Sequence, residues 1–156
     1  MTKRYNWKTV RMIETTMKKN ILIPFLFCVL PLQAQTLTVG DVFREMPDSI
    51  VPYLTENNRL DMLDFMASHM KAVVQNRFEG HSEMLTLTDD SLSLRLSDAL
   101  RMTIRLVDSR LEVDGARLLI RVDEQVGIPT AVVDNKCTFY SIKWRKLAGK
   151  EVDLVK

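Results

Sequence analysis

Two neighbouring stretches of the chain alternate strictly between apolar and polar residues. In residues 91–97 the leucines at 92, 94 and 96 share one face, and in residues 100–106 positions 100, 102, 104 and 106 do the same. An alternation of period two predicts half-buried β-strands. The three residues between the strands predict a hairpin, in which Leu94 lies opposite Met102 and Leu96 opposite Leu100.

A second hairpin is predicted around Asp114-Gly115, the strongest short-range hairpin signal. A two-residue turn pairs Val113 with Ala116, and the same register extended places opposite charges across the strands. The expected neighbours are Leu111 with Leu118, Glu112 with Arg117, Asp108 with Arg121, and Arg105 with Glu124. Leu106 and Leu111 differ in parity, so both face the core only if a bulge lies near residues 108–109.

The part of the chain that precedes these hairpins, from residue 38 to about residue 76, has a helical period instead. A helix is expected over residues 38–46, with Asp41 near its N-terminus and Pro47 ending it. A second helix is expected to restart at Asp48 or Ser49 with Pro52 in its first turn. From NNRLDMLDFMASHM (residues 57–70) onward, apolar residues at 60, 63, 66, 67, 70, 73 and 74 predict an amphipathic helix. It is expected to be capped by Asn58 with Asp61 and to end near Asn76 or Gly80. Arg59, Asp61, Asp64, Ser68 and Lys71 are expected on its polar side.

The remaining chain predicts two further strands, a short one at residues 130–134 and a last one at residues 137–144. Thr138, Tyr140, Ile142 and Trp144 share one face of the last strand. The fold class expected is α+β, with N-terminal helices packed on one face of an antiparallel β-meander sheet. The other face is expected to meet water or a partner.

Residues 1–34 are typical of a leader with a secretory signal peptide. Lys18 and Lys19 precede an apolar run over residues 21–32, and Ala34 offers a cleavage site. The run of twelve residues is shorter than the roughly 20 that span a bilayer, which favours a cleaved leader over a stable membrane span. Met17 is the expected true start. Residues 35–156 are then a single exported domain, in the periplasm, on the cell surface or secreted.

Removing the leader reverses the sign of the charge. Residues 1–34 hold six basic and one acidic residue of the 22 basic and 20 acidic in the chain, so residues 35–156 have a net charge of about −3. The apparent basicity therefore does not indicate nucleic-acid binding. Without Cys28 the domain keeps one cysteine, Cys137, whose place at the start of an apolar strand favours a buried, inert thiol.

No set of residues predicts catalysis, a cofactor or a metal ion. His69 could join Asp61 and Asp64 on one helix, but zinc needs three or four converging ligands and a solvated helix face is the favoured interpretation. His81 is expected in a loop. Asp89-Asp90 fit an acidic turn better than a calcium site. Ser141 and Cys137 have no identifiable base, and no glycine-rich phosphate loop occurs.

Three arginines form a less ordinary pattern on the outer side of the first hairpin. Arg95 is expected opposite Arg101, and Arg105 follows on the same face. Like charges directly opposite each other are destabilising, so Asp98, Glu124 or an acidic ligand is expected to offset them. The sequence favours an exposed face with flexible arginines. The alternative is a contact surface for an anion, a glycan or a partner protein.

Several stretches resemble an uncharacterised family of secreted proteins from Bacteroides-type bacteria, the domain-of-unknown-function family DUF3256. They include Met46 to Ser49, Pro52 to Leu54, Asn57 to Met62 and Leu87 to Asp90. The resemblance implies an exported protein and supplies no catalytic residue. We therefore expect a non-catalytic envelope or surface domain that binds a protein or ligand. The alternative is a periplasmic carrier or inhibitor-like domain that holds an apolar ligand between helices and sheet.

Overall fold

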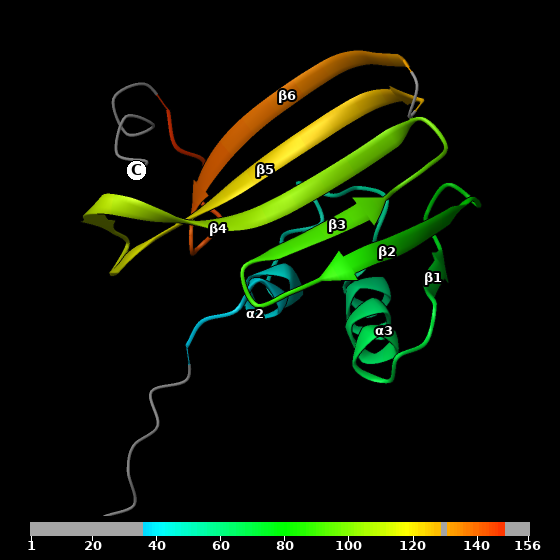
Figure 1. Cartoon of the computed structure of the whole chain (residues 1–156), viewed down its shortest axis with the longest axis horizontal. Helices are drawn as coiled ribbons and strands as arrows, with labels where there is room; N and C mark the ends of the chain where they lie inside the picture. Colours follow the sequence, from blue (N-terminus) through cyan, green and yellow to red (C-terminus); the bar gives the residue numbers. More distant parts are fainter. Residues whose placement is uncertain (1–35, 129–130, 149–156) are drawn as a thin grey trace, which may run out of the picture. The chain divides into compact units, whose positions relative to one another are not determined.

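The described part of the chain is an antiparallel sheet of six strands with two short helices, which is an α+β arrangement (Figure 1). The computed structural model describes residues 36–128 and 131–148, and the predicted leader lies outside them. The strands lie side by side in chain order, as predicted for a meander. They are β1 Ala72–Gln75, β2 His81–Leu87, β3 Ser91–Arg95, β4 Leu100–Val113, β5 Ala116–Ile128 and β6 Ala131–Ser141.

Helix α2, Val39–Arg44, begins where the sequence predicts it. The hydroxyl of Thr38 accepts a hydrogen bond from the backbone N–H of Asp41, and the Asp41 carboxylate accepts one from the backbone N–H of Thr38. This reciprocal capping box satisfies two donors at the helix start. The bond from the Thr38 backbone also lowers the pKa of Asp41.

The prediction of a helix after Asp48 is wrong. Residues 47–54 form turns instead, in which the N–H of Ile50 bonds to the carbonyl of Pro47 and that of Leu54 to Val51. Val51 precedes Pro52, and a residue before proline is disfavoured in helical conformation. The turns still bury Val51 and Leu54 completely.

Helix α3, Glu56–Ala67, begins one turn earlier than predicted. Its cap is Thr55, and Asn58 occupies the third helical position, where its side-chain oxygen accepts the backbone N–H of Thr55 at 3.0 Å. The expected cap at Asn58 with Asp61 is therefore wrong. Both residues of the capping box lie three positions before those predicted, which is one turn of helix.

The end of α3 was also mispredicted, because the chain turns at His69 and then forms β1. His69 has φ of 56°, its N–H bonds to the carbonyl of Met66, and the N–H of Met70 bonds to that of Phe65. This is a Schellman motif with a residue in left-handed conformation just past the helix. Met70, expected on the apolar face, is 52% exposed, whereas Ala72 and Val74 are buried on a strand.

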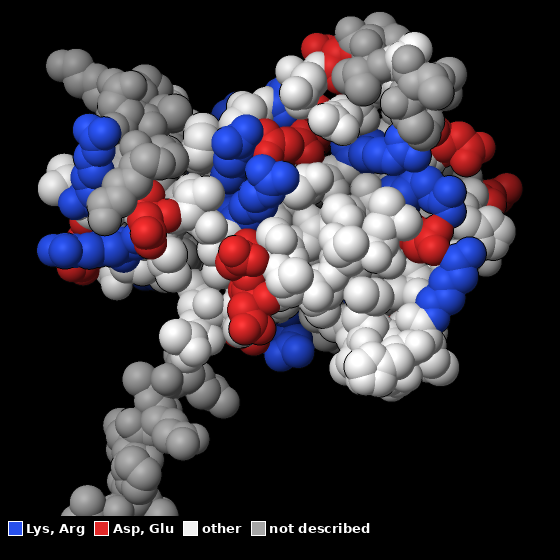
Figure 2. Space-filling model, viewed as in Figure 1, with Lys and Arg blue, Asp and Glu red and all other residues white. Residues whose placement is uncertain are grey.

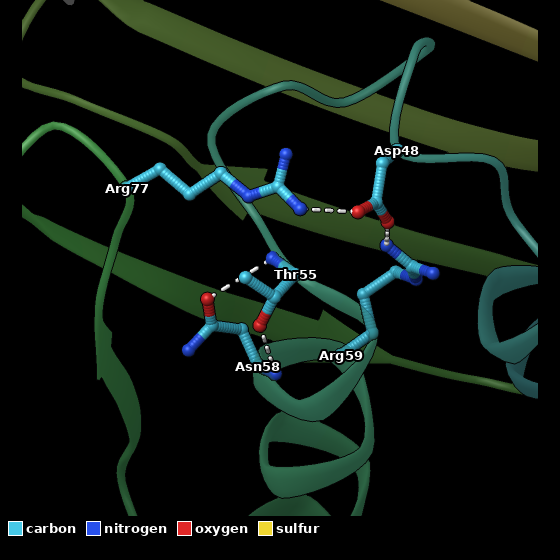
Figure 3. A network of polar contacts seen from close by, with 5 residues as sticks. All are labelled: Asp48, Thr55, Asn58, Arg59 and Arg77. Atoms are coloured by element: carbon cyan, nitrogen blue, oxygen red, sulfur yellow. Dashed lines mark hydrogen bonds and ion pairs between the residues drawn. The ribbon is translucent and has the colours of Figure 1, made fainter.

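Arg59 is buried, although the sequence places it on the polar side of α3. It is 3% exposed, and its guanidinium forms a salt bridge with Asp48, with Nη1 2.7 Å from Oδ1. Asp48 lies between Arg59 and Arg77, so one carboxylate joins the turn before α3, the helix and the β1–β2 turn (Figure 3). Hydrogen bonding from Arg59 lowers the pKa of Asp48.

The first hairpin, β3–β4, confirms the predicted register. Leu94 lies opposite Met102, and Arg95 lies opposite Arg101. The N–H of Leu96 donates to the carbonyl of Leu100 at 2.9 Å. Leu92, Leu94, Met102 and Ile104 are buried on the core side, which leaves the alternate residues of both strands on the opposite side.

The second hairpin, β4–β5, keeps the predicted turn and bulge but not the register beyond them. Val113 pairs with Ala116 as predicted, whereas Asp108 pairs with Leu118 because residues 109–112 face Arg117 alone. The buried Ser109 stabilises this bulge, since its hydroxyl donates to the carbonyl of Leu111 at 2.6 Å. The predicted pairs Leu111–Leu118, Asp108–Arg121 and Arg105–Glu124 are therefore wrong, whereas Glu112 and Arg117, the fourth predicted pair, both lie within the bulge.

The last two predicted strands form one strand, β6, which ends at Ser141. The chain then turns, and Trp144 adopts φ of 60°. Its indole still lies beside Tyr140, with ring centroids 5.5 Å apart, and its Nε1 donates to the carbonyl of Val42 in α2 at 2.8 Å. The segment after β6 is thereby tied to the first described helix.

One large hydrophobic core joins the residues of α2 and α3 to the strands. Its fully buried members include Phe43, Met46, Leu54, Met62, Leu92, Leu94, Met102, Ile104 and Ile120. A second, small cluster of Val113, Leu119 and Leu147 lies at the hairpin end.

Candidate functional site

The strand register gathers four arginines on the side of the sheet that alternates with the core, which we call the outer face. Arg95 of β3 lies opposite Arg101 of β4, and Arg105 of β4 lies opposite Arg121 of β5. We call these the first and second arginine pairs. The sequence predicted the first pair but missed Arg121, because the register beyond the bulge differs by three residues.

Acidic neighbours offset one arginine of each pair. Glu83 of β2 lies opposite Arg95 and forms a salt bridge with it. Asp123 forms a salt bridge with Arg121, with Nε 2.9 Å from Oδ2, and the hydrogen bonds that Arg121 donates to this carboxylate raise the pKa of Arg121. Basic and acidic side chains adjoin at several places on the face that Figure 2 shows.

Arg101 and Arg105 have no salt bridge with any residue of the described ranges. Glu124, one of the acids expected to offset them, lies opposite Met102 on the core side and binds Lys136 at 2.8 Å. Asp98, the other, lies in the β3–β4 turn. The outer face therefore carries two arginines that form no salt bridge with an acid of the described chain.

Small polar residues fill the row between the two arginine pairs. Ser93, Thr103, Asp123 and Cys137 lie opposite one another on successive strands. The expectation of a buried Cys137 is wrong, since the residue is exposed. Neighbouring groups nevertheless remove enough water from the thiol to raise its pKa, so the unreactive protonated form prevails at neutral pH.

A surface pocket of about 320 Å³ adjoins the first arginine pair at the end of β2 and β3. His81, which begins β2 rather than lying in a loop, is on the outer face because it alternates with Glu83. We call this hollow the terminal pocket. Its lining consists of Asn76, Gly80, His81, Arg95, Ser97 and Asp98.

The two turns that frame the terminal pocket are fixed by side-chain hydrogen bonds. Asn76 is buried, donates to Ser82 Oγ at 3.1 Å and to the Leu96 carbonyl at 3.2 Å, and accepts from the N–H of Phe78 at 2.9 Å. Ser97 Oγ accepts from the N–H of Leu100 at 3.1 Å. The pocket is therefore preformed, as is usual for ligand sites.

The other residues considered as candidate sites lie in turns or form hydrogen bonds with neighbouring residues of the fold. His69 lies in the turn just past α3. The buried Ser141 hydroxyl accepts hydrogen bonds from the N–H groups of Lys143 and Arg145 at 3.3 Å. Asp90 accepts the hydroxyl of Thr88 at 2.7 Å within a turn. Over the described ranges, no three His, Cys, Asp or Glu side chains converge as metal ligands would. No described helix has the length and apolar character needed to cross a bilayer.

Comparison with known proteins gives a family and a similar fold. A family model described as "Protein of unknown function (DUF3256)" matches residues 29–154. A structure of a domain of an uncharacterized protein from Porphyromonas gingivalis W83 is similar, with a TM-score of 0.55 and 22% identity over 71% of this chain. The match covers 54% of that chain, so this protein spans about half its length. No curated protein matches.

Proposed function

The chain belongs to the DUF3256 family, and we propose that it is an exported, non-catalytic domain that binds an anionic partner through the outer face of its sheet. The observation that carries the proposal is the presence of two arginine pairs in which Arg101 and Arg105 have no acidic partner among the described residues.

The arginine pairs are unfavourable for the sheet by themselves. Like charges directly opposite each other are destabilising, and cross-strand pairs contribute on the order of 0.2–1 kcal/mol. Residues 35–156 have a net charge of about −3, so the positive face is not a reflection of general basicity. A local positive surface on an acidic chain favours association with an anion.

The leader supports export. Lys18 and Lys19 followed by the apolar run and Ala34 have the order of a secretory signal peptide. Export predicts that the protein purified from the periplasm or the cell surface begins at Gln35. Mass spectrometry of the intact protein measures this directly, and a chain that retains its leader in the cytoplasm contradicts the exported role.

The chemistry of the outer face supports binding rather than catalysis. It offers guanidinium groups, the hydroxyls of Ser93 and Thr103, and the thiol of Cys137 with a raised pKa. Among the described residues of this face, no hydroxyl or thiol is hydrogen-bonded to a histidine that could activate it.

The binding role is tested by titrating the exported protein with sucrose octasulfate, a compact polyanion, and following backbone amide shifts by NMR. We expect the largest shifts at residues 93–105, and we expect them to disappear in the double variant Arg101→Gln/Arg105→Gln. The control Arg110→Gln/Arg117→Gln removes two exposed arginines from the far end of the β4–β5 hairpin. Binding that survives in the first variant, or that maps to α2 and α3, contradicts the proposal.

A further inference from the structure

We propose that the terminal pocket and the two arginine pairs form one site for an acidic glycan. The pocket holds one sugar residue, and the arginines hold the anionic groups of the sugars that follow. The inference rests on the proposed function and specifies its ligand class. Arg95 connects the two parts, because it lines the pocket and also lies opposite Arg101.

The chemistry of the terminal pocket suits a ligand rich in hydroxyl groups. Arg95 supplies donors, Asp98 supplies acceptors, and His81 can supply either. A sugar hydroxyl both donates and accepts, so it is best satisfied where both kinds of group converge. A volume of about 320 Å³ is at the small end of the range for ligand pockets, which fits a single ring rather than a long chain.

The spacing of the arginines favours an extended ligand. Arg101 and Arg105 are four residues apart on β4, which corresponds to about 13 Å along a strand. A single small anion contacts both guanidinium groups only if the two side chains bend toward each other. A chain with carboxylate or sulfate groups at intervals can do so, and guanidinium groups bind such oxyanions through paired hydrogen bonds.

The side chains between the arginine pairs favour a glycan over a folded protein. Protein interfaces concentrate their binding energy in buried aromatic and arginine anchors within a largely apolar centre from which water is excluded. Here Ser93, Thr103 and Asp123 separate the pairs. None of the exposed large hydrophobic residues of the described chain lies on β3 or between Arg101 and Arg105 on β4.

The test compares three probes by calorimetry on the exported protein: hexagalacturonate, its carboxyl-reduced neutral counterpart, and a peptide of six glutamates. We expect hexagalacturonate to bind and the neutral hexamer to bind at least tenfold more weakly. We expect Arg101→Gln/Arg105→Gln to weaken hexagalacturonate binding about tenfold to hundredfold, as loss of charged hydrogen bonds does. The control Arg110→Gln/Arg117→Gln is expected to bind as the natural protein does.

The pocket is tested separately with His81→Ala/Asp98→Ala, whose folding is checked by its thermal unfolding curve. We expect this variant to bind hexagalacturonate at least tenfold more weakly; unchanged affinity overturns the role of the pocket. If the glutamate peptide binds as tightly as the glycan, the ligand class is wrong while the anion-binding function stands. If neither anionic probe nor sucrose octasulfate binds, both proposals fail.

Discussion

The indole Nε1 of Trp144 donates a hydrogen bond of 2.8 Å to the backbone carbonyl of Val42, 102 residues earlier in the chain. The bond connects the segment after β6 to α2, and both residues are buried. It therefore joins the two ends of the described fold across one hydrophobic core. A donor in this position satisfies a buried carbonyl that water does not reach.

Replacing Trp144 with phenylalanine should lower the free energy of unfolding by about 1 to 2 kcal/mol, because the carbonyl of Val42 loses its donor. Urea unfolding followed by circular dichroism measures this. Tyr140→Phe is the matched control, since it keeps the ring contact with Trp144 and should change stability by less than about 0.5 kcal/mol. Equal effects of the two substitutions would contradict the role assigned to the indole N–H.

Asp48→Asn should destabilise the domain more than Arg77→Gln does. Arg59 is 3% exposed and its Nε has no hydrogen-bond partner in the described chain, so removal of the Asp48 charge leaves a buried cation without its counterion. Arg77 is partly exposed and can be solvated instead. Midpoints of urea unfolding rank the two variants, and the reverse order would show that the buried pair contributes little.

Stability should fall with acid, because the folded protein lowers the pKa of three aspartates. Bonds from the Thr38 backbone, the Arg59 guanidinium and the Ser141 hydroxyl lower the pKa of Asp41, Asp48 and Asp114 respectively. Below the unfolded value of about 3.9 the unfolded chain binds more protons than the folded one. The stabilisation is therefore fully present above that value and is lost as pH falls through the folded values.

Unfolding free energies measured between pH 7 and pH 2 test this dependence. The free energy should begin to fall as the pH approaches the unfolded value of about 3.9 and should continue to fall toward pH 2. Asp48→Asn should show a shallower decrease, since it removes one of the three groups. A flat profile across this range would mean that these carboxylates titrate alike in the folded and unfolded states.

His69→Gly should stabilise the domain by about 0.5 to 1 kcal/mol. His69 holds φ of 56° just past α3, a conformation that glycine adopts without the steric cost that other residues meet. Denaturant unfolding in the presence of a chelator measures the effect. Loss of stability on this substitution would contradict the backbone argument. Stabilisation of the natural protein by zinc without a chelator, abolished in His69→Gly, would instead favour the metal-binding interpretation of His69 with Asp61 and Asp64.

The strands whose register was predictable have uninterrupted alternation or a defined turn. The leucines of β3 alternate without a break, and Asp114-Gly115 sets its turn by backbone geometry alone. The bulge was predictable from parity, but parity does not say how many residues it contains. The actual bulge shifts the register by three residues, and Arg105 therefore lies opposite Arg121 rather than opposite Glu124.

The remaining errors arise where one pattern fits two structures. Val73 and Val74 continue the helical period of α3, and they also fit the short strand β1 that they form. The stop at His69 was hidden because the left-handed residue is not glycine. Glu83 was missed as the partner of Arg95 because a bulge after Met84 breaks the alternation of β2. Only the folded sheet brings these residues together.

The most direct test of the outer face compares the unfolding free energy of the natural protein and of Arg101→Gln/Arg105→Gln, each with and without sucrose octasulfate. Without the anion, the variant should be more stable by about 0.2 to 1 kcal/mol, because like charges no longer face each other. With the anion, the natural protein should gain stability by mass action and the variant should not. Equal stabilisation of both proteins by the anion would contradict an anion-binding outer face.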